Sequence, residues 1–257
     1  MKLSSAFSLL TDLRLAIQHA LLPTLWAIWA NPSLLFHVQE LSRIFMSHVW
    51  VAFGDGVDEN GSEVKKSLIP QAKGVVLDLG AGHGHTVKYL DHDKITKYVA
   101  IEPNELMHPE IRKVANAAGY TEAAGTLLIL RYGAEQIELI NSALGGSLAV
   151  DSIISILTIC SIPSPEETVG KLVGQVLKPG GQFLFYEHVL SPREDVAWWQ
   201  RFWTPIWLWA FDGCRLDRPT HLWVDKLDCW ESRDIWGKEG EDVENLFWHR
   251  VGRFVKA

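Results

Sequence analysis

Two patterns of apolar and polar residues divide the chain. Over residues 5–22, polar residues fall on one side of a period near 3.6 and aliphatic residues on the other, which predicts an amphipathic helix. Residues 31–53 keep helical spacing, and residues 54–67 suggest a polar loop and a helix start. The polar face of the amphipathic helix and the breaks expected at Pro23 and Pro32 leave no apolar run near the roughly 20 residues that a membrane span needs. We expect N-terminal helices that either pack over the rest of the protein or lie in a membrane interface.

From residue 71 onward, short apolar runs alternate with helical patterns. The expected strands are residues 75–79, 98–101, 126–130, 150–162 and 182–189, with a helix starting at 86 and others over 111–118 and 166–177. This alternation predicts an α/β fold with a doubly wound, mostly parallel, Rossmann-like sheet. Ligands bind such sheets at the carboxyl ends of the strands, where the strand order reverses. Binding residues should therefore follow the strands directly.

The first of these strands ends at an acid and opens into glycines at every second position. Asp78 is followed by Gly80, Gly82 and Gly84, which lack Cβ atoms where a ligand must approach backbone N–H groups. A dinucleotide fingerprint requires a sixth-position glycine, and that position is His85 here. This difference disfavours a nicotinamide dehydrogenase.

The second strand ends in another acid. Glu102 lies at the distance from the glycine turn that a ribose-binding carboxylate requires, and its two oxygens suit a vicinal diol. Acid-x-Gly-x-Gly-x-Gly is also the first motif of class I S-adenosylmethionine (SAM) dependent methyltransferases, which this chain resembles. The run Leu-Lys-Pro-Gly-Gly at 177–181, of which residues 178–181 should form a turn, resembles another signature of that class. The resemblance implies SAM as cofactor, bound by Asp78, Gly80, Ala81, Gly82, Glu102, Pro103, Ala134, Glu135, Thr158 and Cys160.

Three later segments narrow the resemblance to one subgroup. Residues 183–189, 211–216 and 249–256 resemble the small membrane-associated methyltransferase-like proteins that act as alkyl thiol S-methyltransferases. The similarity runs roughly from residue 41 to the C-terminus and is weak over residues 225–244, and His83 and His85 depart from the subgroup's first motif. The resemblance implies a thiol acceptor and attachment to an internal membrane through the N-terminus.

Methyl transfer from a sulfonium is an in-line displacement, so an enzyme chiefly aligns donor and acceptor and excludes water. A thiol with a pKa near 8.5 needs little help from a base at neutral pH. The candidate catalytic residues are His188, at the end of the fifth strand, and Asp212, in a Phe-Asp-Gly-Cys turn. The structural alternatives are a hydrogen-bonded histidine and an aspartate that caps the turn. For Cys160, the alternative to a place beside the cofactor's methionine part is a small buried apolar side chain.

The uneven distribution of tryptophans along the chain predicts an aromatic lid. Of 12 tryptophans, nine lie within residues 198–248 and none within 51–197. We expect N-terminal helices over residues 1–70 and a methyltransferase domain over 71–257, with an aromatic insertion at 192–224 that covers a lipophilic acceptor or packs as core. The formal charge of −7 argues against a nucleic-acid partner, and three widely spaced cysteines indicate neither a metal site nor a disulfide framework.

Three functions remain after these observations. The leading one is a SAM-dependent methyltransferase for a small lipophilic acceptor, such as a thiol, inside the cell and either cytoplasmic or attached peripherally to an internal membrane. An alternative keeps the fold and SAM but catalyses a rearrangement or cyclisation without methyl transfer. A membrane-bound interaction protein without turnover is the third, and the combination of Gly80, Gly82 and Glu102 speaks against it. The oligomeric state is left open.

Overall fold

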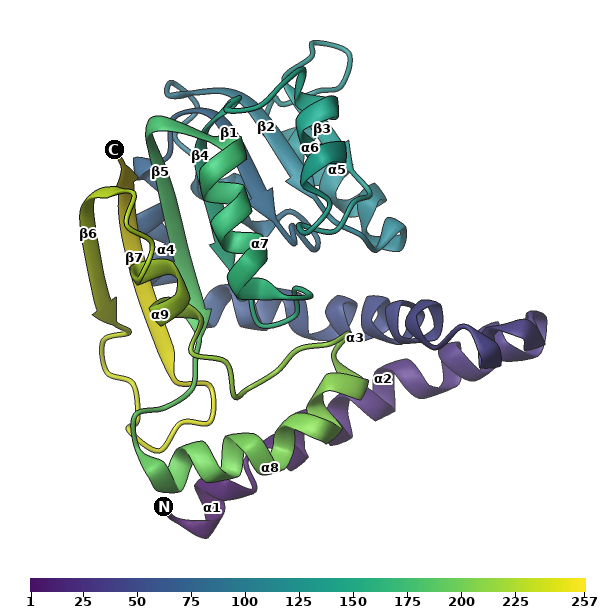
Figure 1. The fold of residues 1–257 in the computed structure, drawn as a ribbon. Helices are drawn as coiled ribbons and strands as arrows, with labels where there is room; N and C mark the ends of the chain where they lie inside the picture. Colours follow the sequence, from purple (N-terminus) through teal and green to yellow (C-terminus); the bar gives the residue numbers. More distant parts are fainter.

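A seven-stranded sheet forms the centre of the protein, whose computed structural model describes residues 1–257 (Figure 1). The strand order is β3-β2-β1-β4-β5-β7-β6, with the first five parallel and β7 antiparallel to both of its neighbours. The order reverses between β1 and β4, so the predicted doubly wound, mostly parallel sheet is confirmed. The strands are β1 Gly74–Leu79, β2 Ile95–Ile101, β3 Leu127–Leu130, β4 Val150–Ile156, β5 Leu177–His188, β6 Trp230–Gly237 and β7 His249–Lys256.

Helices cover both faces of the sheet and bury two separate apolar cores. One face packs against α6 (Ile137–Leu144), α7 (Pro165–Lys171) with its π-helical continuation Leu172–Val176, and α9 (Thr220–Asp225). The other face packs against α4 (Ser62–Leu68) with the 3₁₀ turn Ile69–Gln71, the 3₁₀ segment His85–Tyr89 and α5 (His108–Ala117). Strands buried on both sides explain why their sequences are nearly continuous apolar runs.

A third layer lies across the carboxyl ends of the central strands (Figure 1). It consists of α1 (Leu3–Ala6), α2 (Leu9–Ala30), the 3₁₀ segment Pro32–Phe36, α3 (Val38–Asn60) and α8 (Glu194–Ala210). Its core joins Ala16 and Ala20 of α2 and Val49 of α3 to Trp203 and Trp207 of α8. Both tryptophans are only 4% exposed, so they hold the layer together. No helix in the structure combines the length and the apolar character that a membrane crossing demands.

The N-terminal helices are longer than the sequence predicts. α2 continues through Pro23 to Ala30, because the helix packs along α3 with Ala16, Ala20 and Thr24 buried, which offsets the lost backbone hydrogen bond. The loop expected from residue 54 is also wrong, since α3 runs on to Asn60. There the buried Asp58 carboxylate accepts from Lys65 Nζ at 2.7 Å and from the Tyr89 hydroxyl at 3.0 Å, which stabilises the last turn.

Three predicted boundaries in the sheet region are wrong for local reasons. The fourth strand ends at Ile156 instead of continuing to 162, because Leu157 has a φ of +55° and a turn follows. The expected turn at 178–181 is instead an irregular start of β5, where the register shifts and Gly180 has a φ of +70°. The helix expected at 86 is only a short 3₁₀ segment, which begins after the left-handed Gly84.

Candidate active site

The turn after β1 has a backbone that glycine adopts far more readily than other residues. Gly80, Gly82 and Gly84 have φ values of +58°, +56° and +81°, in the left-handed region. There is also no room for a side chain, because a Cβ on Gly80 would lie 2.5 Å from Cγ2 of Thr158. A Cβ on Gly82 would lie 2.7 Å from Nε1 of Trp50. The turn is therefore a place of close backbone approach, as an anion or ribose cradle requires.

Glu102 connects this turn to the end of β2. Its Oε2 accepts from the Gly82 amide at 2.9 Å and its Oε1 accepts from the Asn104 amide at 2.8 Å. Burial raises the pKa of Glu102 to about 7, against the lowering effect of these two amides. Each oxygen retains a second lone pair, so the carboxylate can still accept from a diol. Next to these two residues, Ala81 is buried and donates its amide to the Ile101 carbonyl, and Pro103 begins the loop after the strand.

Helix α3 adds two polar side chains that the sequence analysis missed. The Arg43 carbonyl accepts from Asn104 Nδ2 at 2.9 Å, which places α3 beside the loop after β2. Nε of Arg43 and Nε1 of Trp50 are buried and have no hydrogen-bond partner. The glycine turn, the Glu102 carboxylate and these two unpartnered donors together fit SAM. This cofactor carries a ribose and a charged amino-acid part. Both residues belong to an ordinary helical pattern, so no local signal marks them.

The other residues predicted to bind the cofactor differ in their surroundings. Asp78 is 1% exposed and accepts from the Tyr98 hydroxyl at 2.6 Å, and burial raises its pKa to about 6. Asp78 therefore orients the turn from inside the protein. After β3, Ala134 is buried, whereas Glu135 is exposed. Both lie at the carboxyl edge of the sheet, beyond β2.

The turn after β4 is fixed by a buried carboxylate that the sequence analysis also missed. Glu187 Oε1 accepts from the Ser155 hydroxyl at 2.7 Å and from the amides of Thr158 at 2.9 Å and Ile159 at 3.3 Å. The Thr158 hydroxyl in turn donates to the Leu79 carbonyl at 2.9 Å. Glu187 thus holds the turn after β4 against the end of β1.

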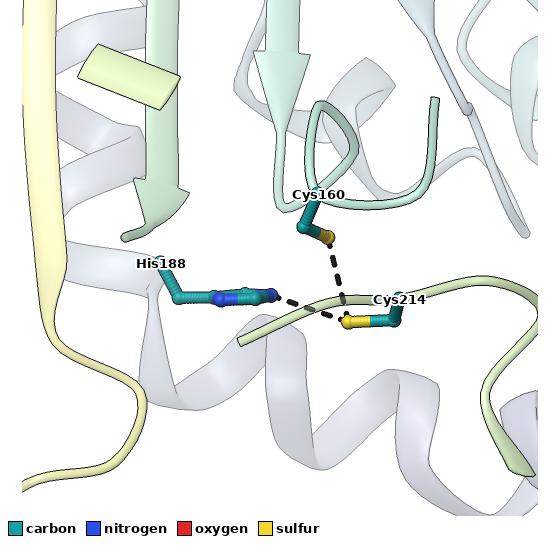
Figure 2. A group of neighbouring side chains, drawn as sticks. All are labelled: Cys160, His188 and Cys214. Carbon is teal, nitrogen blue, oxygen red and sulfur yellow. Dashed lines mark hydrogen bonds between the residues drawn. The ribbon is translucent and has the colours of Figure 1, made fainter. Parts of the chain in front are cut away.

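Beside that turn, Cys160, His188 and Cys214 converge (Figure 2). Cys214 Sγ lies 3.5 Å from Cys160 Sγ and 3.3 Å from His188 Nε2. The hydrogen bond from Cys214, together with burial, raises the pKa of Cys160. Two cysteines 54 positions apart thus become neighbours in the fold, which their spacing in the sequence does not indicate.

The two predicted catalytic side chains face different partners. His188 is 4% exposed and faces the thiols, and its Nδ1 has no hydrogen-bond partner. Asp212 has a φ of +44° and lies near Ser42 and Arg43 of α3. Burial raises the pKa of Asp212, whereas the nearby Arg43 and Ser42 lower it. Asp212 therefore belongs to the Glu102 side of the site and His188 to the thiol side.

The buried Glu102 should make the protein less stable as the pH rises. Its pKa is about 7 when folded against an ordinary 4.5, so the folded protein keeps a proton that the unfolded chain releases between these values. The stabilisation is complete below the lower value and is lost as the pH passes the upper one. Through this group we expect the free energy of unfolding to fall by about 2–3 kcal/mol from about pH 5 to about pH 8. Urea unfolding of the wild type and of Glu102→Gln at several pH values measures this change in the free energy of unfolding. The same dependence on pH in both proteins would contradict the prediction.

The sequence is similar to that of known methyltransferases. The methyltransferase domain family matches residues 56–227. Rat thiol S-methyltransferase TMT1B is 30% identical over 162 residues, which cover 63% of this chain and 62% of that protein. The human TMT1B is 28% identical over 196 residues, which cover 73% of this chain and 75% of its own.

Solved structures share the fold at low identity. An O-methyltransferase family protein from Burkholderia thailandensis superposes with a TM-score of 0.61 at 14% identity, over 91% of this chain and 70% of that one. The family and the fold imply the use of SAM. Since the family match extends over more than half of the sequence and contains the glycine turn, Glu102, Cys160, His188 and Cys214, this chain belongs to the methyltransferase domain family.

Proposed function

We propose that the protein transfers a methyl group from SAM to a small lipophilic thiol. SAM supplies an electrophilic methyl group on a sulfonium sulfur. Gly80, Gly82 and Glu102 would hold the nucleoside part, and Arg43 and Trp50 of α3 would cover it and exclude water. The thiol acceptor finds support in the relatives that are named thiol S-methyltransferases.

A wall of aromatic rings is the observation that carries the lipophilic part of the proposal. Phe247 packs edge-on to His188, with ring centroids 5.5 Å apart, and lies 5.4 Å from Trp207. The Trp207 ring stacks on the Phe211 ring, with centroids 3.9 Å apart. The Phe211 ring in turn lies 6.5 Å from the ring of Phe53 on α3. The rings continue from the thiol side of the site into the third layer. An apolar acceptor would lie against this wall, where the absence of water strengthens the attraction between a thiolate and the sulfonium.

Product mass tests the reaction directly. Full-length protein is incubated with SAM and lipophilic thiols, phenols, amines or carboxylic acids, with Glu102→Ala as the inactive control. We expect a thiol product heavier by one methylene, formed together with S-adenosylhomocysteine. Methylation of another acceptor class alone would contradict the thiol. Conversion without a mass change would favour the rearrangement or cyclisation.

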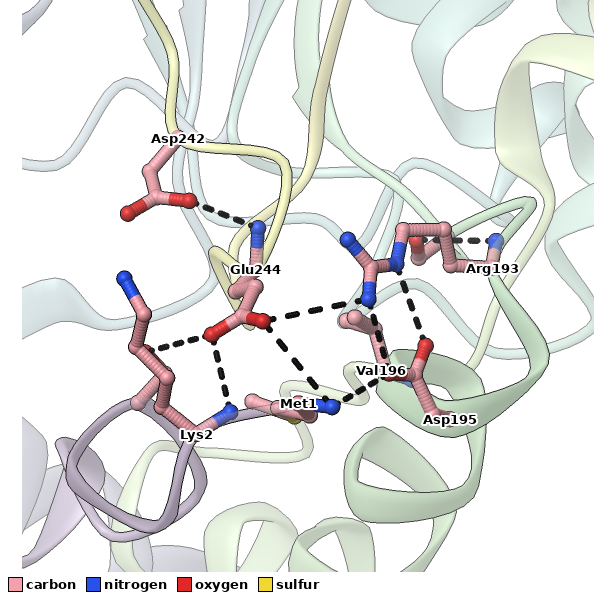
Figure 3. Close-up of polar contacts among 9 residues, drawn as sticks. Met1, Lys2, Arg193, Asp195, Val196, Asp242 and Glu244 are labelled. Carbon is pink, nitrogen blue, oxygen red and sulfur yellow. Dashed lines mark hydrogen bonds and ion pairs between the residues drawn. The ribbon is translucent and has the colours of Figure 1, made fainter.

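We also propose that the third layer rests on a lipid surface. α2 exposes Trp26 and Trp29 at 66% and 76%, and α8 exposes a stripe that includes Trp198 at 56% and Trp209 at 65%. At the start of α1, the Met1 ammonium pairs with Asp195 at 2.6 Å and the Lys2 amide donates to Glu244 at 2.9 Å (Figure 3). These contacts fix α1 against α8 and against the loop between β6 and β7. Amphipathic helices with exposed indoles suit the membrane interface.

Removing three exposed indoles should release the protein from vesicles. The triple variant Trp26→Ser, Trp29→Ser and Trp198→Ser is expected to lower binding to phosphatidylcholine vesicles by at least about 10-fold, since each indole loses apolar burial in the lipid. Trp236→Ser on β6, where the side chain is 39% exposed, is the matched control. Flotation measures bound protein. Equal losses in the triple variant and the control, or no binding by wild type, would contradict the proposal.

A further inference from the structure

Three metal-ligating atoms converge in the active site. Cys160 lies in the turn after β4, His188 is the last residue of β5, and Cys214 lies between α8 and α9 (Figure 2). Their two sulfur atoms and one ring nitrogen all lie within 4.8 Å of one another. Tetrahedral zinc with bonds of about 2.3 Å to sulfur and about 2.0–2.1 Å to nitrogen sets its ligand atoms roughly 3.5–3.8 Å apart. The observed separations of 3.5 Å between the sulfurs and 3.3 Å from Cys214 Sγ to His188 Nε2 are close to this geometry.

The segments that carry the two thiols are held together before any ligand arrives. The Arg218 guanidinium donates to the carbonyls of Cys160 at 2.6 Å and Ile162 at 2.8 Å. The Arg215 amide donates to the Cys160 carbonyl at 3.3 Å. Glu187 fixes the start of the same turn through the Ile159 amide. Because backbone contacts position the thiols, a ligand would find them already in place.

The charge around the cluster also favours a cation. Cys160 is 1% and His188 4% exposed, and no lysine or arginine nitrogen hydrogen-bonds to either sulfur. The Arg218 guanidinium donates to the carbonyls of Cys160 and Ile162 and to neither sulfur, so a buried Cys160 thiolate beside a half-buried Cys214 thiolate would still need a neutralising charge. A divalent ion would supply that charge. A disulfide would use only the two sulfurs and would leave the convergence of His188 unexplained.

We propose that Cys160, His188 and Cys214 bind one thiophilic divalent cation of the zinc class. Three protein ligands leave the fourth tetrahedral position free. We assign that position to the sulfur of the acceptor, and this assignment rests on the proposed thiol substrate. The acceptor R–SH releases its proton to solvent as its sulfur binds the cation. That sulfur then forms the bond to the methyl carbon while the bond from the methyl carbon to the sulfonium sulfur breaks, leaving the thioether and S-adenosylhomocysteine.

Cobalt titration tests the site without SAM or acceptor. Reduced full-length protein is titrated with Co²⁺ and followed by thiolate-to-cobalt absorption in the near ultraviolet, with Zn²⁺ added afterwards as competitor. We expect one Co²⁺ per chain and displacement by Zn²⁺. Cys160→Ser and Cys214→Ser should each weaken binding by at least about 100-fold, the upper end of what losing an outer-sphere partner alone produces. His188→Gln should weaken binding while keeping both thiolate contributions to the spectrum.

Cys229→Ser is the matched control, because the third cysteine lies outside the cluster and packs against one of the two sheet cores. This variant should bind Co²⁺ as wild type does. Absence of stoichiometric binding in reduced wild type, or unchanged binding when Cys160 and Cys214 are both replaced, would overturn the proposal. Binding without methylation of any thiol would leave the metal site standing and contradict only the proposed acceptor. Thiol methylation by protein that binds no metal would contradict the metal site and leave the proposed thiol acceptor standing.

Discussion

Replacing Glu102 with alanine is expected to weaken SAM binding by at least about 100-fold and to abolish methyl transfer. Glu102 is the buried carboxylate at the end of β2, and charge-assisted hydrogen bonds to a ribose diol are worth about 1.5–3 kcal/mol each. Losing two of them therefore exceeds a factor of 100 in affinity. Isothermal titration with SAM measures the loss directly.

The fold must be checked separately in this variant. Alanine leaves the Gly82 and Asn104 amides without their acceptor, at about 1–3 kcal/mol for each buried group, so some loss of stability is expected. Glu105→Ala is the matched control, because it removes the same charge from an exposed side chain three positions on. Wild-type affinity in Glu102→Ala, or an equal loss in Glu105→Ala, would show that Glu102 does not hold the cofactor.

Replacing Gly82 with alanine should have the second large effect, because it acts on conformation and space together. The φ of +56° disfavours any side chain by about 1–2 kcal/mol. The new Cβ would also lie 2.7 Å from Nε1 and 3.2 Å from Cε2 of Trp50, an indole held on α3. Either the turn or α3 must move. We expect a loss of at least about 2 kcal/mol in the free energy of unfolding and a SAM affinity reduced by about 100-fold.

A second substitution separates the two causes. In the Gly82→Ala background, Trp50→Ala removes the contact but not the unfavourable φ, so it should recover part of the lost stability in a double-mutant cycle. Gly174→Ala is the control, because nothing lies within 4 Å of its Cβ position and its backbone is helical. Urea unfolding gives both values. Strict additivity of the two substitutions would mean that Trp50 does not press on the glycine turn.

The features predicted correctly from sequence are those fixed by neighbouring residues. Apolar runs of strand length specified the five parallel strands, because strands buried on both faces need continuous aliphatic residues. The glycine spacing after Asp78 predicted a special turn, and the three glycines have positive φ values. The family resemblance rested on the same local motifs, and the match over residues 56–227 confirms it.

Features that depend on distant partners were predicted poorly. Pro23 lies inside a continuous helix because α2 packs along α3. Cys160 and Cys214 meet although 54 positions separate them, because the connection after α8 returns to the turn after β4. The position of α3 over the glycine turn likewise follows from packing, through contacts such as Trp50 with Gly82.

The sequence by itself therefore determined the parallel strands of the sheet, the glycine turn and the family. All three depend on backbone preference and on the periodic burial of neighbouring residues. Only the tertiary structure decided which side chains share the candidate active site. Arg43 and Trp50 lie on α3, Glu187 on β5 and Cys214 between α8 and α9, and their convergence depends on long-range contacts that no local pattern encodes.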